Sequence, residues 1–451
     1  MSTALIVLAA GQGSRMKSSR PKVLHEVAGR SLLAHALAAG AALDPARTVV
    51  VTGHGSDAVE AALARIAPGA VVARQAERAG TAHAVAQARE ALAGFAGDVA
   101  VLYGDTPFID AETLLGMKAA REGGADVVVL GFEAADPGRY GRLIAEGDRL
   151  ERIVEFKDAS PEERAVTLCN SGVVMAEAWT LFGLIEQVGN DNAAGEYYLT
   201  DIVGLARAAR MSARVVVCDE AETLGVNSRA DLAAAEAAFQ RRARARAMAA
   251  GVTMVAPETV FLSHDTAIAP DVVVEPNVVF GPGVTVETGA RVRAFSHLDG
   301  CRVGPGCTVG PYARLRPGAD LSDGARVGNF VEVKNATIGP GAKLPHLSYV
   351  GDAAVGARAN LGAGTITCNY DGVFKHRTEI GADAFIGSNT MLIAPVSVGA
   401  EALTASGSVI TADVPEGALA VARGRQTNKP GLARRLVARL RAAKETGKEA
   451  R

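Results

Sequence analysis

The chain has 451 residues, with 47 lysines and arginines against 49 aspartates and glutamates, which gives a formal net charge of −2. This length exceeds what one hydrophobic core usually organises, so we expect two or three domains, and the balanced charge excludes an overall field that would draw the protein to nucleic acid or to a membrane surface. The aromatic fraction of 4% also argues against stacking on single-stranded nucleic acid.

The first ten residues resemble a strand and not a targeting signal. They form an apolar run with no basic leader and no small-residue cleavage pattern, and no apolar segment of the sequence approaches the length of a membrane span. We therefore expect a cytoplasmic protein without membrane insertion. Five cysteines, none of them in a C-x-x-C pair, are expected to be reduced structural thiols: Cys169, Cys218, Cys301, Cys307 and Cys368.

Residues 1–227 alternate short β-branched runs with alanine-rich helical stretches. This alternation predicts β-α-β units and a Rossmann-like, mostly parallel α/β sheet, whose ligands bind at the carboxyl ends of the strands. The expected strands include residues 4–8, 48–52, 99–103, 126–130 and 214–217, and the expected helices include residues 32–42 and 80–92.

A glycine-rich loop with basic residues follows the first expected strand. Between Leu8 and Leu24 the sequence reads L-A-A-G-Q-G-S-R-M-K-S-S-R-P-K-V-L. Glycines let the backbone N–H groups approach phosphate oxygens, while Arg15 and Lys22 supply positive charge. The string completes neither the G-x-G-x-x-G dinucleotide fingerprint nor the Walker A pattern, but as a whole it closely resembles the signature of sugar-nucleotide pyrophosphorylases. That resemblance implies a nucleotidyltransferase domain with Arg15 and Lys22 as its catalytic cations.

A carboxylate follows the expected strand at residues 99–103, in the sequence Gly104-Asp105-Thr106-Pro107. Mg²⁺ prefers oxygen ligands and keeps several waters, so one carboxylate, one neutral oxygen and substrate phosphates would hold it. The run Leu224-Gly225-Val226-Asn227-Ser228 resembles the second metal motif of the pyrophosphorylases. Asp105 and Asn227 are therefore the expected magnesium ligands.

Further positions match the nucleotide and sugar contacts of that family. Gln75, Gly80 and Thr81 resemble its uracil-contacting segment, and Gly141, Glu155 and Asn170 resemble its sugar-contacting set. The resemblance implies a UDP-sugar site formed by Leu8, Ala9, Ala10, Gly11, Lys22, Gln75, Gly80, Thr81, Tyr103, Gly104, Asp105, Gly141, Glu155, Asn170 and Asn227.

Residues 228–250 predict a connecting helix, because Ser228 is a good N-cap, strong helix formers follow and Gly251 ends the run. From Leu262 to about Ile410 an aliphatic residue then returns every six residues, with a few slips. That period fits neither a helix nor an ordinary strand. It indicates a left-handed parallel β-helix of hexapeptide repeats, interrupted at about residues 365–379. The expected domains are residues 1–227, 228–250 and 251–451.

Three side chains suggest a second site on the β-helix. His346 lies near a coil corner, where a neutral imidazole could accept a proton from an attacking amine. Arg316 and Lys334 are 18 residues apart, one full coil, so they can stack on one face and bind a phosphate. The fold alone leaves two possibilities open, an acyltransferase and an oligomerisation scaffold.

The sequence resembles, over essentially its whole length, the bacterial bifunctional enzymes of UDP-N-acetylglucosamine synthesis. In that family His346 would be the general base of acetyl transfer, and Ser406 stands where alanine is common. Family members are homotrimers whose acetylation sites are completed by neighbouring subunits. The resemblance implies that Arg316, Lys334, Tyr349, Asn360 and Lys375 bind glucosamine 1-phosphate and that Ala363, Asn369, Tyr370, Ser388, Ser406 and Arg423 line the acetyl-CoA path.

We therefore predict a bifunctional enzyme that acetylates glucosamine 1-phosphate with acetyl-CoA and then couples the product to UTP, using Mg²⁺ and releasing pyrophosphate. Its expected partners are these small molecules and further copies of the chain. Two alternatives are a nucleotidyltransferase whose β-helix serves only as a scaffold, and a non-catalytic regulatory protein built from the same folds. The basic tail past Pro415 is either a solvated segment or an anion-binding one.

Overall fold

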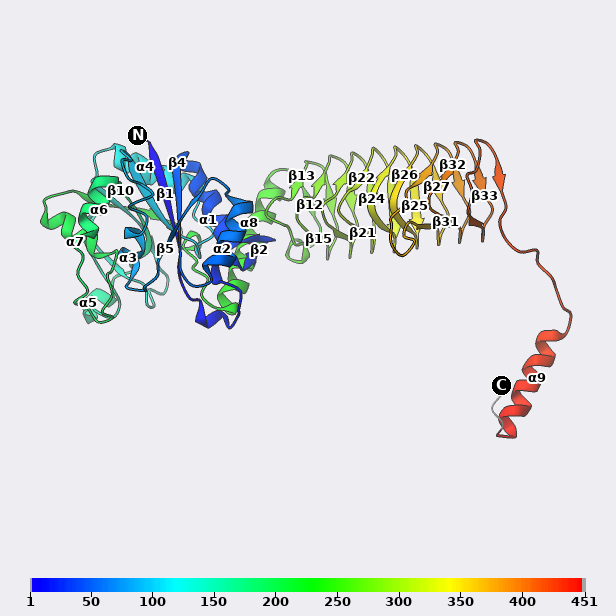
Figure 1. The fold of residues 1–451 in the computed structure, drawn as a ribbon, viewed down its shortest axis with the longest axis horizontal. Coiled ribbons are helices and arrows are strands. Elements are labelled where there is room, and N and C mark those ends of the chain that lie inside the picture. The colour runs from blue at the N-terminus through cyan, green and yellow to red at the C-terminus, as the bar shows by residue number, and fades with distance from the viewer. Residues whose placement is uncertain (1, 448–451) are drawn as a thin grey trace. The chain divides into compact units, whose positions relative to one another are not determined.

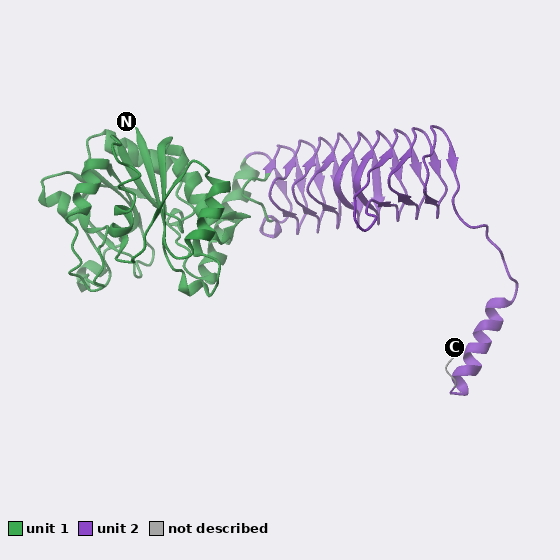
Figure 2. Cartoon of the chain, in the orientation of Figure 1, with its two compact units in different colours: residues 1–249, 261–266 green, residues 250–260, 267–451 purple. Residues whose placement is uncertain are grey.

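The computed structural model describes residues 2–447, and the chain divides into two compact units (Figure 2). Unit 1 runs to Ala249 and includes Phe261–Thr266, whereas unit 2 takes Ala250–Val260 and continues from Ala267. No helix within residues 2–447 is both long and apolar enough to cross a membrane.

Unit 1 is built on a nine-stranded sheet (Figure 1). Strand β1 pairs in parallel with β4 and β6, and β11 pairs in parallel with β7, so the predicted Rossmann-like, mostly parallel sheet is confirmed. Strand β10 lies antiparallel between β6 and β7, which the sequence analysis did not predict. In spatial order the strands are β5 (Val71–Arg74), β4 (Pro45–Thr52), β1 (Thr3–Ala9), β6 (Asp98–Tyr103), β10 (Leu168–Glu177), β7 (Val127–Glu133), β11 (Ala213–Cys218), β9 (Arg149–Val154) and β8 (Arg142–Glu146).

Helices cover both faces of this sheet. Leu5 and Val7 of β1 point to one face of the sheet, where they pack against helices α1, α2 and α4. Ala4 and Ile6 point to the other face, where they pack against α3, α6 and α7. A strand buried on both faces explains the continuous apolar run at the start of the sequence. The helices are α1 (Leu32–Gly40), α2 (Ser56–Ile66), α3 (Thr81–Ala86), α4 (Ala111–Glu122), α5 (Pro161–Arg164), α6 (Ala178–Ile185), α7 (Asp201–Ala208) and α8 (Arg229–Ala249), with short 3₁₀ turns η1 (Ser14–Met16) and η2 (Lys22–Leu24) and a small hairpin β2 (Glu26–Val27) and β3 (Arg30–Ser31).

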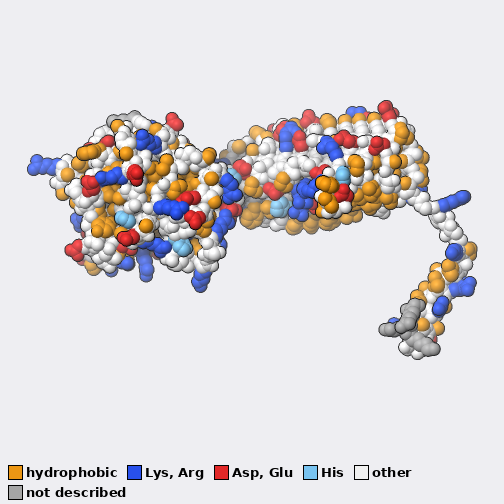
Figure 3. Space-filling model, in the orientation of Figure 1, with side chains coloured by type: hydrophobic (Ala, Val, Ile, Leu, Met, Phe, Trp, Pro, Cys, Tyr) orange, Lys and Arg blue, Asp and Glu red, His pale blue; other side chains and the backbone are white. Residues whose placement is uncertain are grey.

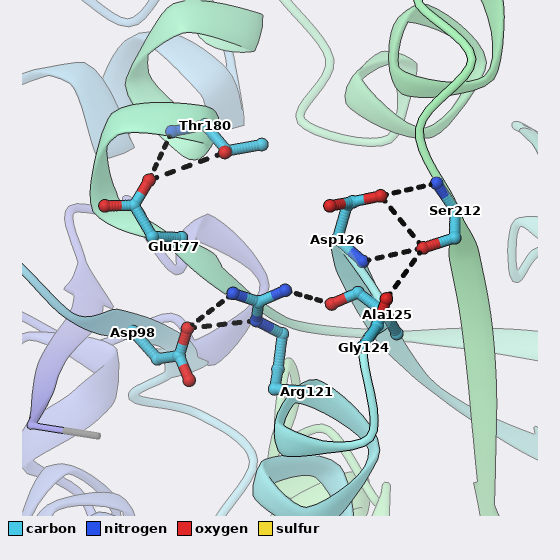
Figure 4. Close-up of polar contacts among 8 residues, drawn as sticks. All are labelled: Asp98, Arg121, Gly124, Ala125, Asp126, Glu177, Thr180 and Ser212. Carbon is cyan, nitrogen blue, oxygen red and sulfur yellow. Dashed lines mark hydrogen bonds and ion pairs between the residues drawn. The ribbon is translucent and has the colours of Figure 1, made fainter.

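A buried ion pair fixes the edge of the sheet where β6 begins (Figure 4). The Arg121 guanidinium donates to Oδ1 of Asp98 at 2.8 and 2.9 Å, and both side chains are almost fully buried. Beside it, Oδ2 of Asp126 accepts the N–H and the hydroxyl of Ser212 at 2.7 and 2.9 Å. These contacts hold the amino ends of β6, β7 and β11, which leaves the carboxyl ends of the parallel strands free to build a ligand site.

Helix α8 begins with a reciprocal cap, as predicted for Ser228. The N–H of Asp231 donates to Oγ of Ser228 at 3.1 Å, and Oδ2 of Asp231 accepts the N–H of Ser228 at 2.9 Å. Further along α8, the Gln240 side chain exchanges two hydrogen bonds with the backbone of Leu262, of 2.7 and 2.9 Å. The helix and residues 261–266 therefore belong to the compact body of unit 1.

Unit 2 is a parallel β-helix of very short strands. Its strands pair in parallel with partners one coil away, for example Val274 with Val292 and Val292 with Val309. The inward aliphatic residues of the repeats are buried, as the six-residue period predicts, except Ile268 near the start of the β-helix, which is partly exposed. The strands form three columns. The first column begins with β12 followed by β14, the second with β13 followed by β16, and the third with β15 followed by β18.

The strands of unit 2 are β12 (Thr253–Met254), β13 (Ala267–Ile268), β14 (Val273–Val274), β15 (Val279–Phe280), β16 (Thr285–Val286), β17 (Arg291–Val292), β18 (His297–Leu298), β19 (Arg302–Val303), β20 (Thr308–Val309), β21 (Arg314–Leu315), β22 (Ala319–Leu321), β23 (Arg326–Asn329), β24 (Glu332–Ile338), β25 (Lys343–His346), β26 (Tyr349–Val355), β27 (Asn360–Leu361), β28 (Ile366–Cys368), β29 (Thr378–Ile380), β30 (Phe385–Ile386), β31 (Met391–Ile393), β32 (Val396–Val398), β33 (Leu403–Thr404), β34 (Val409–Ile410) and β35 (Leu419–Ala420).

Two segments depart from the repeat. Between β28 and β29 the chain forms a small hairpin, in which Tyr370 bridges Lys375 and Oδ1 of Asp371 accepts the N–H of Phe374 at 2.7 Å. The basic tail contains helix α9 (Leu432–Glu445), which has no buried residue. The sequence analysis predicted the interruption but not this helix.

Candidate functional sites

The loop after β1 brings Lys22 against the glycines that precede it. Gly13 has a φ of +61°, and a Cβ atom there would lie 2.6 Å from Cβ of Lys22. A larger residue at this position would therefore both strain the backbone and displace the lysine. Lys22 begins the 3₁₀ turn η2, and only 10% of its side chain is exposed.

Nζ of Lys22 contacts both of the expected metal ligands. It contacts the carboxylate of Asp105 and lies 3.0 Å from Oδ1 of Asn227. The N–H of Gly104 donates to the carbonyl of Leu8 at 2.9 Å, and the N–H of Val226 donates to the carbonyl of Asp105 at 2.9 Å. Segments more than 200 residues apart are therefore held together, and their side-chain oxygens converge on one cation.

This donor set fits Mg²⁺. A carboxylate and a neutral amide oxygen that both face one cationic atom are hard oxygen donors, and such a site keeps room for phosphate oxygens and water. Within residues 2–447 no three His, Cys, Asp or Glu side chains form a metal-binding group. Any magnesium ion here would therefore depend on substrate oxygens to complete its coordination.

A cavity of about 280 Å³ opens beside this point, between the carboxyl ends of β1, β5 and β6. A cavity at the carboxyl edge of a parallel sheet is where such folds bind ligands. Nine of the predicted contact residues line it, and so do four residues that the sequence analysis did not select: Leu8, Ala10, Gly11, Lys22, Gln75, Gly80, Thr81, Tyr103 and Asp105, with Val23, Arg78, Ala84 and Glu196.

The predicted uracil-contacting segment packs against a loop from later in the chain. Gly80 has a φ of +117°, and a Cβ atom there would lie 2.4 Å from the carbonyl oxygen of Tyr197. The amide of Gln75 donates to the carbonyl of Gly80 at 3.2 Å, and Thr81 Oγ1 accepts the N–H of Leu199 at 2.9 Å. The segment is therefore rigid where it faces the cavity.

The predicted sugar-contacting residues lie together beside the antiparallel strands, with Asn170 in β10, Gly141 just before β8 and Glu155 just after β9. The N–H of Asn170 donates to the carbonyl of Gly141 at 2.9 Å, and the Glu155 carboxylate lies 3.5 Å from where a Gly141 Cβ would stand. Burial raises the pKa of Glu155, although a 3.3 Å hydrogen bond from Thr200 opposes that shift. Burial and the charges of Asp105 and Glu155 also raise the pKa of Tyr103.

Seven predicted residues of unit 1 are not among those that line the cavity: Ala9, Arg15, Gly104, Gly141, Glu155, Asn170 and Asn227. Of these, Arg15 is exposed in η1 and Ala9 is buried inside β1. Among the residues that the sequence analysis missed, Arg78 donates to Oε1 of Gln12 at 2.7 Å and so joins the glycine loop to the Gln75 segment. Its only sequence signal was its place three residues after Gln75.

In unit 2, His346 is exposed at the end of β25 and pairs with Asn329 on the preceding coil. Nδ1 of His346 lies 2.6 Å from Oδ1 of Asn329. The sequence analysis did not select Asn329, because the two residues are neighbours only through the register of the coils.

Three predicted phosphate-binding cations gather nearby on the β-helix. The neighbouring Lys375 and, less strongly, Arg316 lower the pKa of Lys334, because one positive charge disfavours another. Arg316 also donates to Glu332 at 2.8 Å, and strand pairing of Leu315 with Val333 stacks Arg316 and Lys334 one coil apart as expected. An excess of positive charge of this kind favours an anionic group.

The Tyr349 hydroxyl accepts a 3.5 Å hydrogen bond from Nδ2 of Asn369, and the same nitrogen donates to the carboxylate of Asp352. Asn369 is buried, whereas Tyr370 beside it is exposed in the inserted hairpin. Asn360 lies in β27, between the strands of Lys343 and Phe385, and no hydrogen bond in the described part of the chain links its side chain to the other predicted sugar-phosphate residues.

Four of the predicted acetyl-CoA residues, Ala363, Ser388, Ser406 and Arg423, form one column down the corner that contains His346. Successive coils are joined there by backbone hydrogen bonds, from Gly364 to Leu347 at 3.1 Å, from Asn389 to Ala363 at 2.7 Å and from Gly407 to Ser388 at 2.8 Å. The column continues where Nη1 of Arg423 donates to the carbonyl of Ser406 at 2.8 Å. The Ser406 contact uses its main chain and is independent of the side chain.

Comparisons with known proteins extend over both units. Residues 5–168 match the family described as a MobA-like NTP transferase domain. The chain is 66% identical over 444 residues to the bifunctional protein GlmU of Dinoroseobacter shibae, with 98% of this chain and 99% of that protein covered. It is also 66% identical to the bifunctional protein GlmU of Ruegeria sp. (strain TM1040), with the same coverage, and 64% identical to that of Cereibacter sphaeroides (strain ATCC 17025 / ATH 2.4.3), with 99% and 98% covered.

Proposed function

The chain belongs to the family of bifunctional GlmU proteins, and from that premise we propose which of its residues carry each of the two activities. It is an enzyme that transfers an acetyl group from acetyl-CoA to glucosamine 1-phosphate and then a uridylyl group from UTP to the N-acetylated product. The UDP-N-acetylglucosamine formed is a precursor for cell-wall synthesis. The observation that carries this conclusion is the high identity over 98% of the chain, because it includes both units.

We assign uridylyl transfer to residues 1–227, with residues 228–250 as the connecting helix. The phosphate oxygen of N-acetylglucosamine 1-phosphate attacks the α-phosphorus of UTP, and the bond to the departing pyrophosphate breaks. Lys22 lies at the cavity wall with little exposure to water, so its ammonium offsets the charge that builds on the leaving group. Arg15 is exposed on the same loop, from which it would contact the outer phosphates.

Asp105 and Asn227 would hold Mg²⁺, since both side-chain oxygens already face the Lys22 ammonium. The metal would add charge neutralisation on the triphosphate. Gln75, Gly80 and Thr81 orient the base, while Glu155 and Asn170 orient the sugar.

We assign acetyl transfer to residues 251–451. The amine nitrogen of glucosamine 1-phosphate attacks the thioester carbon of acetyl-CoA, His346 accepts the proton that the amine loses, and the CoA thiolate leaves. Arg316, Lys334 and Lys375 bind the phosphate and so place the amine. The column of Ala363, Ser388, Ser406 and Arg423 provides backbone and cationic contacts for the long CoA chain, with Asn369 and Tyr370 beside it.

We further propose that copies of the chain associate through an exposed aromatic ladder on unit 2 and form a homotrimer. Phe295 stacks on Tyr312 with ring centroids 5.0 Å apart, and Tyr312 stacks on Phe330 at 5.2 Å. All three have φ between +55° and +59°, which residues with bulky side chains rarely adopt, and about half of each residue's surface is exposed. Figure 3 shows hydrophobic side chains gathered along one edge of the β-helix. Burial against the same ladder of a second copy would remove this apolar surface from water.

The ladder leads to the acetylation residues. Phe330 directly follows Asn329, and the next corner residue, Leu347, directly follows His346 and is 58% exposed. An interface along this corner therefore places a second copy beside the proposed base. We also propose a cytoplasmic location, where UTP and acetyl-CoA are available and the five free thiols stay reduced.

One assay tests the proposed function. Purified protein is incubated with glucosamine 1-phosphate, acetyl-CoA, UTP and Mg²⁺, and free thiol and pyrophosphate are followed together while each substrate is omitted in turn. Thiol should appear without UTP, and pyrophosphate should require acetyl-CoA unless N-acetylglucosamine 1-phosphate is supplied. Pyrophosphate formation from the acetylated sugar with no release of thiol would show that the β-helix is only a scaffold.

A further inference from the structure

We propose that Asn329 is a positioning residue for acetyl transfer. Its side-chain oxygen accepts the Nδ1–H of His346 and thereby selects the imidazole tautomer whose Nε2 can take a proton from the substrate amine. This inference rests on the proposed acetyltransferase function of unit 2. It adds a residue that neither the sequence motifs nor the resemblance supplied.

The first step of the argument is the contact itself. Oδ1 of Asn329 lies 2.6 Å from Nδ1 of His346, and the two residues are paired in the register of β23 and β25. An amide oxygen has no proton to donate, so the hydrogen of this bond must be on Nδ1. In a neutral imidazole that leaves the lone pair on Nε2, the ring atom farther from the backbone.

The second step is the rigidity of the pair. A Cβ atom on Gly328 would lie 1.9 Å from the carbonyl oxygen of Pro345, so only glycine lets the two coils approach this closely next to the contact. The N–H of Leu347 donates to the carbonyl of Asn329 at 3.0 Å, and Ser348 Oγ donates to the carbonyl of His346 at 2.8 Å. The backbone on both sides of the imidazole is therefore fixed.

The third step is the chemistry of the orienting group. Exposed histidine rings rotate and exchange tautomers, which divides the population among unproductive states. A neutral amide that holds Nδ1–H selects one state without adding a negative charge beside the ring. A second group that orients the base is a recurring feature of nucleophile activation and proton transfer.

Two variants separate positioning from simple loss of structure. Asn329→Leu keeps the size of the side chain but removes the acceptor, and we expect kcat for acetyl transfer to fall roughly tenfold to 100-fold with a smaller change in KM. Asn329→Asp restores an acceptor, so it should recover much of the rate and shift the acidic limb of the pH–rate profile to higher pH, because a carboxylate stabilises the imidazolium. Uridylyl transfer by each preparation is the internal control and should be unchanged.

A double-variant cycle tests whether Asn329 acts through His346. If it does, His346→Ala with Asn329→Leu should be no slower than His346→Ala alone. If Asn329→Leu lowered the rate of acetyl transfer by the same factor in the unmodified chain and in His346→Ala, the proposal would be overturned. An unchanged kcat in Asn329→Leu alone would also overturn it.

A spectroscopic readout keeps the proposal separate from the proposed function. In protein labelled with ¹⁵N-histidine, the signal that His346→Ala removes should report Nδ1–H as the dominant neutral tautomer, and Asn329→Leu should convert it to a mixture. A dominant Nε2–H tautomer in the unmodified chain would refute the role of Asn329. If the unmodified chain releases no CoA at all, the proposed acetyltransferase function fails instead, whatever the tautomer.

Discussion

Nζ of Lys22 donates a hydrogen bond of 3.0 Å to Oδ1 of Asn227, a residue 205 positions later in the chain. The reciprocal cap of α8 helps to fix Asn227, because Oδ2 of Asp231 accepts its N–H at 3.0 Å. The nucleotide loop at the start of unit 1 and the segment just before its last helix therefore both contact the Lys22 ammonium. Loss of that cation should affect one activity of the enzyme and leave the other intact.

Lys22→Met should lower the rate of uridylyl transfer by about 10²–10³-fold, since a fixed positive charge in a poorly hydrated site stabilises the developing charge on pyrophosphate. Pyrophosphate release from UTP and N-acetylglucosamine 1-phosphate measures this change. Lys17→Met is the matched control, because Lys17 is an exposed lysine on the same loop. Equal effects of the two substitutions would contradict a specific role for Lys22.

Gly80→Ala should destabilise unit 1 and raise KM for UTP. The new Cβ atom would lie 2.4 Å from the carbonyl oxygen of Tyr197 and would push that loop away from the cavity. We expect a loss of about 1–3 kcal/mol in the free energy of unfolding, measured with urea. Gly94→Ala is the control, because Gly94 also has a positive φ, of +68°, but no atom lies within 4 Å of the new Cβ position. The KM of the Gly94→Ala variant for UTP should equal that of the unmodified protein.

Glu155→Gln should stabilise unit 1 at neutral pH while it weakens sugar binding. Burial raises the pKa of Glu155 above 4.5, so folding disfavours the ionised carboxylate. The stability that Glu155 contributes is therefore present below the pKa of the unfolded chain, about 4.3, and is lost as the pH rises through the folded value.

Urea midpoints measured from pH 4 to pH 8 check this prediction. The advantage of the Gln variant should grow with pH through the acidic range and then level off, while KM for N-acetylglucosamine 1-phosphate rises. Glu146→Gln, at the exposed end of β8 in the same hairpin, controls for the loss of any carboxylate. An advantage that shrinks as the pH rises would contradict the stated sign.

Phe330→Glu should convert the assembly to smaller species and reduce acetyl transfer, because it places a charge at the end of the aromatic ladder that lies next to Asn329. Uridylyl transfer should persist. Light scattering coupled to size-exclusion chromatography measures the mass. Val217→Glu is the control on unit 1, since its side chain is about as exposed, 52% against 56%. A mass unchanged by Phe330→Glu would place any interface elsewhere.

Most of the fold could be predicted from the sequence, and so could the residues at the centre of each proposed site. The six-residue period fixes the solenoid because each repeat must bury one aliphatic side chain, and Asp105 was identifiable because it follows a buried strand. The antiparallel strand β10 was not, since alternation of hydrophobic residues carries no information about strand direction. Without the antiparallel strand β10, the sequence analysis could not explain why Gly141, Glu155 and Asn170 lie close together.

The contact between Asn329 and His346 shows a second limit of prediction from the sequence. This contact depends on a spacing of 17 residues between paired strands, as between Arg326 and Lys343, whereas other pairings, such as Leu315 with Val333, have a spacing of 18. A shift of one residue turns a side chain to another face. The sequence indicated that the period slips but not which side chains each slip would pair, so the orienting partner of the base emerged only from the structure.

The most direct test of two independent sites on one chain is to measure both activities in His346→Ala and in Asp105→Ala. Loss of His346, the proposed general base, should lower acetyl transfer by about 10²–10⁴-fold and leave uridylyl transfer from supplied N-acetylglucosamine 1-phosphate unchanged. Asp105→Ala should abolish uridylyl transfer and leave thiol release from acetyl-CoA unchanged. If either variant, folded and of the original mass, lost both activities together, the assignment of the two reactions to separate sites would be contradicted.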